Sequence, residues 1–213
     1  EAMLQNQAVD YHFQPIFTAR NGRVIAYEAL MRPQLATLRS PLTVMELASK
    51  MGRIYDIEKL TMFRASECYE ALEAEGRVEP DARMFVNSIA SVSLTDEDWA
   101  DFAAKHKALL PKLVVEITEE EQMDERELER KRHAPGAAGI FALDDYGSGY
   151  SNGNSLLTIA PRYVKVDIAI IRHIDTDHDK QQFLKTLIDY ARPRGILVLA
   201  EGVETPAELR KVL

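Results

Sequence analysis

The sequence has a single cysteine, Cys68, so an internal disulfide is excluded. It has no apolar run long enough to span a membrane, and its first residues lack the basic-then-apolar pattern of a secretory signal. Low-complexity stretches, linkers rich in Pro, Gly or Ser, and internal repeats are also missing. We therefore expect residues 1–213 to form one domain that makes no membrane contact. We place that domain in the cytoplasm, alone or as the cytoplasmic part of a membrane-anchored protein.

Basic residues are in the minority. The 26 Lys and Arg stand against 34 Asp and Glu, which gives a formal net charge of −8. This balance argues against a nucleic-acid polymer as a partner, because such proteins neutralise phosphates with a positive surface. The net charge does not exclude a small anionic ligand, since bound divalent cations can reverse the local sign of charge.

Short runs rich in Val, Ile, Phe and Tyr recur along the chain, and most are separated by helix-like segments. Such runs are typical of strands buried on both faces, and their alternation with helices predicts a mainly parallel sheet. Two helix starts are marked by Thr95 and by Thr205, the latter with Glu208 three residues on, as in a capping box. The seven runs are residues 9–17, 23–30, 83–89, 112–118, 139–145, 163–171 and 195–202.

One connection breaks the alternation. Only residues 18–23 separate the first two strands, and they contain Asn21-Gly22, a strong hairpin signal. We therefore predict an antiparallel first pair within a modified TIM-type (β/α)8 barrel, with an eighth strand beyond Leu213. An open doubly wound sheet is the alternative, but no Gly-rich phosphate turn follows the first strand.

Polar side chains stand at or near the ends of six consecutive strands. In an α/β barrel these ends form one rim, where catalytic residues gather. A single acid after a strand is usually a helix cap, so the joint pattern is the informative one. The residues are Glu28, Asn87, Glu116, Asp144, Asp145, Lys165, Asp167 and Glu201.

Five carboxylates of this set, those of Glu28, Glu116, Asp144, Asp145 and Glu201, would repel one another. Two like charges about 4 Å apart repel by roughly 4 kcal/mol at an effective dielectric of 20. Hard oxygen ligands with one amide carbonyl suit Mg²⁺ or Mn²⁺. The adjacent acids Asp144 and Asp145 could serve two ions, and two-metal sites recur in phosphodiester hydrolysis.

Ordered motifs give the chain a family resemblance. They are "FQPIF", "YEALMRP" with Glu28-Ala29-Leu30, "FVNS", "VVEITEE", "LDDYGSGYS", "VKVD" and "AEGVET". In this order they resemble the EAL-domain phosphodiesterases of bacterial second-messenger signalling, from about Tyr11 to the last residue. Tyr146 and Ser148 stand where that family usually has Phe and Thr.

The resemblance implies a role for each matching residue. The metal ligands would be Glu28, Asn87, Glu116, Asp144, Asp145 and Glu201. Lys165 would act in catalysis on the attacking water, together with Glu28 and Glu201. Gln14, Arg32 and Asp167 would contact the substrate, and Glu119 would tether the loop at residues 144–151.

The implied activity is metal-dependent hydrolysis of one phosphodiester bond of cyclic di-GMP to linear pGpG. Mg²⁺ or Mn²⁺ would support it, and we expect Ca²⁺ to inhibit. An inactive receptor for cyclic di-GMP is the alternative, and a lyase with Lys165 as Schiff base is a more distant one. The resemblance also suggests a homodimer and flanking sensory or cyclase domains.

Overall fold

The computed structural model describes residue 4 and residues 8–35, 40–118, 125–134, 139–148 and 154–213. The chain forms two compact units. The N-terminal unit comprises residues 1–115 and 123–139, and the C-terminal unit comprises residues 116–122 and 140–213. Both combine strands with helices, so the predicted α/β class is confirmed.

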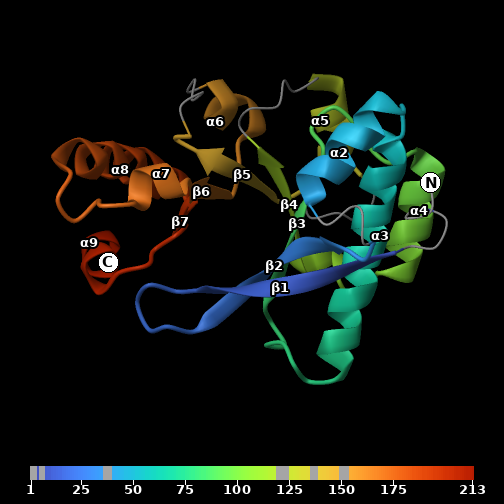
Figure 1. Ribbon diagram of the computed structural model, residues 1–213, viewed down its shortest axis with the longest axis horizontal. Coiled ribbons are helices and arrows are strands. Elements are labelled where there is room, and N and C mark those ends of the chain that lie inside the picture. The colour runs from blue at the N-terminus through green and yellow to red at the C-terminus, as the bar shows by residue number, and fades with distance from the viewer. Residues whose placement is uncertain (1–3, 5–7, 36–39, 119–124, 135–138, 149–153) are drawn as a thin grey trace. The chain divides into compact units, whose positions relative to one another are not determined.

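The N-terminal unit begins with a hairpin of β1 (Val9–Phe17) and β2 (Val24–Pro33), which pair antiparallel as predicted (Figure 1). The turn is closed by the Gly22 N–H, which donates to the Thr18 carbonyl at 2.9 Å. Gly22 has φ +66°, a conformation that glycine adopts without steric cost. Near the turn the pairing shifts from Ile16↔Ala26 to Phe17↔Val24, so Ile25 is an extra residue in β2.

Strand β3 (Arg83–Asn87) pairs parallel with β2 and is packed by helices. Helix α3 (Ile54–Ala74) contacts all three strands and buries Tyr69, whose hydroxyl donates to the Ala82 carbonyl at 3.1 Å. Thr95 caps helix α4 (Asp96–Lys105) by accepting from the Asp98 N–H, as predicted. The other helices of this unit are α2 (Pro41–Lys50), η1 (Leu110–Lys112) and α5 (Glu125–Arg132).

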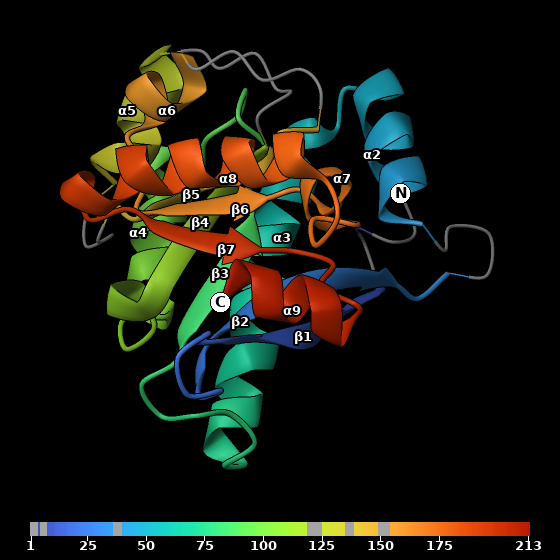
Figure 2. The same cartoon turned by 90° about the vertical axis from the view of Figure 1, so that its left-hand side faces the viewer.

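Strand β4 (Leu113–Thr118) leads from the first unit into the second. The C-terminal unit has three parallel strands in chain order, β5 (Phe141–Tyr146), β6 (Tyr163–Val166) and β7 (Leu197–Ala200). Its helical segments are α6 (Asn154–Ile159), α7 (Ile168–Ile171), α8 (His178–Ala191), η2 (Arg192–Arg194) and α9 (Pro206–Val212). Figure 2 shows α8 running beside β6, and α8 also contacts β7.

One sequence expectation was wrong. The apolar run 163–171 was expected to be a single strand, but β6 ends at Val166 and α7 occupies Ile168–Ile171. Asp167 ends the strand and caps α7, because its Oδ1 accepts the Ala169 N–H at 2.7 Å. The predicted capping box at Thr205 is confirmed. The Thr205 side chain accepts from the Glu208 N–H, and the Glu208 side chain accepts from the Thr205 N–H.

The described residues contain seven strands, and the eighth expected beyond Leu213 stays a prediction. None of the helices in the described part of the chain combines the length and the apolar character that a membrane crossing requires.

Candidate active site

A β-bulge places two acids at the end of β5. The pairing runs from Leu143↔Val164 to Tyr146↔Val166, so Asp144 and Asp145 stand opposite a single residue of β6. Asp145 adopts φ +55° and its N–H donates to Asp144 Oδ1 at 2.9 Å. In a regular strand successive side chains point to opposite faces, and a bulge relaxes that alternation. This is how neighbouring acids can serve one site.

Lys165 is the residue opposite the bulge, and its ammonium group meets three carboxylates. Its Nζ lies 2.8 Å from Glu116 Oε1, 3.0 Å from Asp144 Oδ1 and 2.9 Å from Glu201 Oε1. The Lys165 side chain is only 3% exposed, and that of Glu116 is fully buried. Glu201 is positioned by its own N–H, which donates to the Val166 carbonyl at 3.1 Å. Ion pairs at these distances, shielded from water, hold the lysine in one place.

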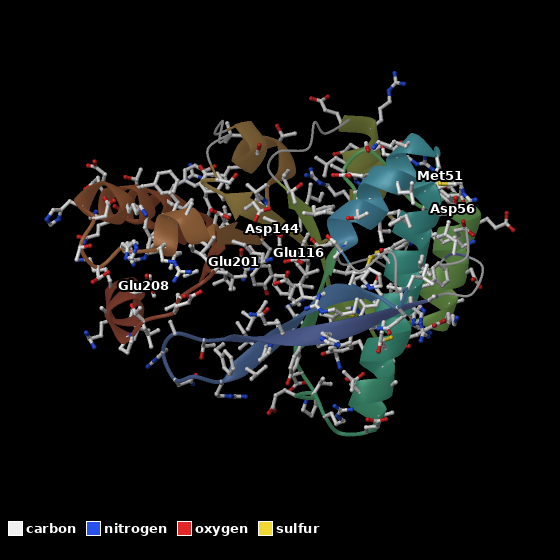
Figure 3. All side chains as sticks on the ribbon, viewed as in Figure 1. Met51, Asp56, Glu116, Asp144, Glu201 and Glu208 are labelled. Atoms are coloured by element: carbon white, nitrogen blue, oxygen red, sulfur yellow. The ribbon has the colours of Figure 1, made fainter. Side chains whose placement is uncertain are left out.

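The donor set of these residues fits a divalent cation. Asp144, Asp145 and Glu201 offer carboxylate oxygens within 4.8 Å of one another. With Glu116 they set four carboxylates against the one ammonium of Lys165, which leaves a formal surplus of negative charge. Figure 3 shows Glu116, Asp144 and Glu201 close together, whereas Glu208 lies apart on α9. All-oxygen, acidic ligands are those that Mg²⁺ and Mn²⁺ prefer.

The N-terminal unit brings together a second group of predicted site residues. Gln14 on β1 is directly opposite Glu28 on β2, and Glu28 is in register with Phe85 on β3. Asn87 follows Phe85 by two residues and so shares its face of the sheet. Gln14 and Asn87 are exposed and Glu28 is half-buried. Gln14, Glu28 and Asn87 therefore share one face of the sheet within this unit.

The other predicted residues have structural contacts of their own. Arg32 donates to the Met31 carbonyl at 2.9 Å and is half-buried. One carboxylate oxygen of Asp167 accepts the Ala169 N–H and so caps α7. The sequence did not suggest this capping role. The tether expected at Glu119 lies outside the described residues.

Two glycines follow the acids closely. Gly147 has φ +99°, and Gly202, which the sequence did not single out, has φ +65°. A Cβ on Gly147 would lie 2.7 Å from Ile170 Cγ1, and one on Gly202 would overlap Ile168. Both glycines thus let the chain pass close to α7, Gly202 directly after Glu201 and Gly147 two residues after Asp145. The available signal for Gly202 was its place immediately after Glu201.

Comparison with known proteins agrees with this arrangement. A family model described as the EAL domain matches residues 1–213. The chain belongs to the EAL domain family. Its α/β fold is shared with solved EAL structures, which are TIM-type barrels. A standalone EAL protein from Vibrio cholerae, in its cyclic di-GMP-bound form, superposes with a TM-score of 0.76 at 26% identity, over 95% of this chain and 84% of that one.

Two further EAL-type matches carry functional names. The cyclic di-GMP phosphodiesterase NbdA of Pseudomonas aeruginosa is 30% identical over 223 residues, which cover 97% of this chain and 27% of NbdA. BlrP1 of Klebsiella pneumoniae, solved as a manganese and cyclic di-GMP complex, matches with a TM-score of 0.75 at 25% identity, over 97% of this chain and 53% of that one. The chain spans less than half the length of the curated relatives it matches first.

Proposed function

We propose that this EAL domain hydrolyses one phosphodiester bond of cyclic di-GMP and releases linear pGpG. The observation that carries the proposal is the buried Lys165 ammonium, held by Glu116, Asp144 and Glu201 beside the bulged Asp145. A positive charge fixed in this way would stabilise the negative charge that develops when water attacks a phosphodiester. The name of NbdA and the ligand of the V. cholerae protein support the same substrate.

The metal ligands in this proposal are Asp144, Asp145, Glu116 and Glu201, together with Glu28 and Asn87 of the N-terminal unit. When bound, Mg²⁺ or Mn²⁺ would lower the pKa of a water ligand and offset negative charge on the phosphoryl oxygens. The BlrP1 complex with manganese supports the choice of ion. We expect larger Ca²⁺ to occupy the site but to support little or no turnover.

The chain's own residues would orient the reactants. Lys165 would place its positive charge beside the attacking water and attract the water oxygen, while its three carboxylate partners keep Nζ from moving. Gln14 and Arg32 would bind the substrate, and the remaining oxygen of Asp167 could accept from it. A Schiff-base lyase needs a neutral amine free to attack, so three ion pairs on Lys165 favour the hydrolase.

The test is incubation of the purified chain with cyclic di-GMP and Mg²⁺, Mn²⁺ or Ca²⁺, with products separated by chromatography. We expect pGpG with Mg²⁺ and Mn²⁺, and little with Ca²⁺ or with chelator. If the chain binds cyclic di-GMP with metal present but forms no pGpG, the domain is a receptor and not an enzyme.

We infer further that the domain works in the cytoplasm within a longer protein, alongside sensory or cyclase domains, and that it pairs as a homodimer. The greater length of its relatives supports a longer protein with further domains. Light scattering of the purified chain tests whether it forms a homodimer.

A further inference from the structure

A buried carboxylate lies behind the end of β3, outside the site described above. Glu58 on α3 is 2% exposed. Its Oε1 accepts from the Ser88 hydroxyl at 2.5 Å, and its Oε2 accepts from the Ile89 N–H at 2.9 Å. Both donors belong to the chain immediately after β3, so Glu58 binds the segment by which the chain leaves the sheet.

A buried lysine completes this network. Lys131 on α5 is 7% exposed at its side chain, and its Nζ lies 2.7 Å from Glu58 Oε1 and 2.7 Å from Ser88 Oγ. Burying such a pair costs desolvation energy that often exceeds the gain, so a well-packed apolar pair would stabilise the fold at least as well. The presence of this ion pair therefore points to a role beyond stability.

The network binds the chain just after the pairing between β2 and β3 ends. The last register pair between β2 and β3 is Ala29↔Val86. Asn87 comes next and is exposed, and the contacts of Glu58 begin at Ser88. Asn87 is thus fixed on one side by the strand ladder and on the other by the carboxylate of Glu58.

We infer that Glu58 is a positioning residue that, with Lys131 and Ser88, sets the direction in which Asn87 presents its side-chain amide. The inference rests on the proposed function, in which the Asn87 carbonyl oxygen is a metal ligand. Partners of this kind behind a metal ligand orient it, and their loss typically weakens metal affinity or activity about 10–100-fold.

The first test needs neither metal nor substrate. In Glu58→Gln we expect NMR relaxation of the Asn87 side-chain amide to show increased motion, and the Ile89 amide proton to exchange faster with solvent. The matched control is Glu70→Gln, which removes a carboxylate from the same helix where it pairs with His106 at 2.8 Å. Unchanged relaxation and exchange in Glu58→Gln would overturn the inference, whatever the chain hydrolyses.

The second test measures Mn²⁺ affinity by titration followed through the EPR signal of free Mn²⁺. We expect Glu58→Gln to bind Mn²⁺ about 10–100-fold more weakly than the parent, and Glu70→Gln to match the parent. Glu58→Gln/Lys131→Gln, which leaves neither charge buried alone, should regain thermal stability but not affinity. Parental affinity in that folded double variant would show a purely structural role. A parent that binds no Mn²⁺ would contradict the proposed metal dependence, and the relaxation test would still decide the positioning role.

Discussion

Asp144 and Asp145 share one partner position on the neighbouring strand, and the residue in that position is Lys165. The bulge thus sets two carboxylates against one ammonium, with Asp145 in a left-handed conformation that few residues other than glycine adopt readily. Charge and a left-handed backbone thus coincide at Asp145, and substitution can separate them.

Asp145→Asn should keep the conformation and lose the charge, because Asn tolerates left-handed backbone better than most residues. Asp145→Ala loses both, and the left-handed backbone should cost it about 1–2 kcal/mol more stability. We expect both variants to bind Mn²⁺ more weakly than the parent and only Asp145→Ala to unfold at clearly lower denaturant. Urea denaturation and Mn²⁺ titration measure the two effects, and equal stability of the variants would contradict the assigned strain.

Lys165→Met removes the central ammonium but keeps the apolar stem. We expect hydrolysis of cyclic di-GMP to fall about 10²–10³-fold, as is typical when one electrostatic stabiliser is lost. The control is Lys185→Met, since Lys185 forms an exposed pair with Asp189 at 2.6 Å and exposed pairs contribute about 0–1 kcal/mol. Turnover numbers of both variants at saturating substrate decide the matter. Parental turnover in Lys165→Met would remove Lys165 from the mechanism.

Gly202→Ala should be costly for two reasons, a positive φ and a collision with Ile168. Gly76→Ala is its matched control, because Gly76 has φ +68° and a Cβ there would meet nothing within 4 Å. The difference in unfolding free energy between the two variants measures the collision alone. Adding Ile168→Ala to Gly202→Ala should recover part of that difference and none of the φ cost. Equal destabilisation of Gly202→Ala and Gly76→Ala would mean that Ile168 on α7 moves aside at no cost in free energy.

Glu208 predicts a pH dependence of stability. Its Oε1 accepts from the His173 N–H, and its Oε2 from the Glu204 and Thr205 N–H groups, at 2.9–3.0 Å. These bonds to the backbone, those from His173 and Glu204 foremost, lower the pKa of Glu208 to about 2. Since the folded pKa lies below the unfolded value, the stabilisation is fully present above about pH 4.5 and is lost as the pH falls toward 2.

Denaturation of the parent and of Glu208→Gln from pH 7 to pH 2 tests this. We expect a stability difference at pH 7 that shrinks below about pH 4.5. Glu204→Gln is the control, because the pKa of Glu204 is lowered by Arg172 at the surface, where salt screens the pair. A Glu208→Gln deficit that stays constant with pH would refute the assignment.

The sequence predicted those features that depend on local patterns. The hairpin followed from Asn21-Gly22, and the helix starts followed from Thr95 and Thr205, because turns and caps depend on a few neighbouring residues. Helix α7 was missed since "IAII" has the β-branched composition of a strand, and the cap supplied by Asp167 overrides that preference.

Features that depend on tertiary packing were not predictable in the same way. The sequence placed Glu116, Lys165 and Glu201 at strand ends, and the structure joins them, but no pattern indicates a bulge between Asp144 and Asp145. The pairing of Glu58 with Lys131 was equally hidden, because the two lie far apart in sequence and each looks like an ordinary surface charge on a helix.

The unpaired Ile25 leaves the hairpin with one position where chain length can change without consequence for the site. Deleting Ile25 would keep Ile16 opposite Ala26, and therefore Gln14 opposite Glu28. Deleting one residue between Ala26 and Glu28 would shift Glu28 by one step and turn it to the other face of the sheet. Natural insertions and deletions in related hairpins should accordingly collect on the turn side of Ala26, and a peptide tag or fluorescent label is best inserted there.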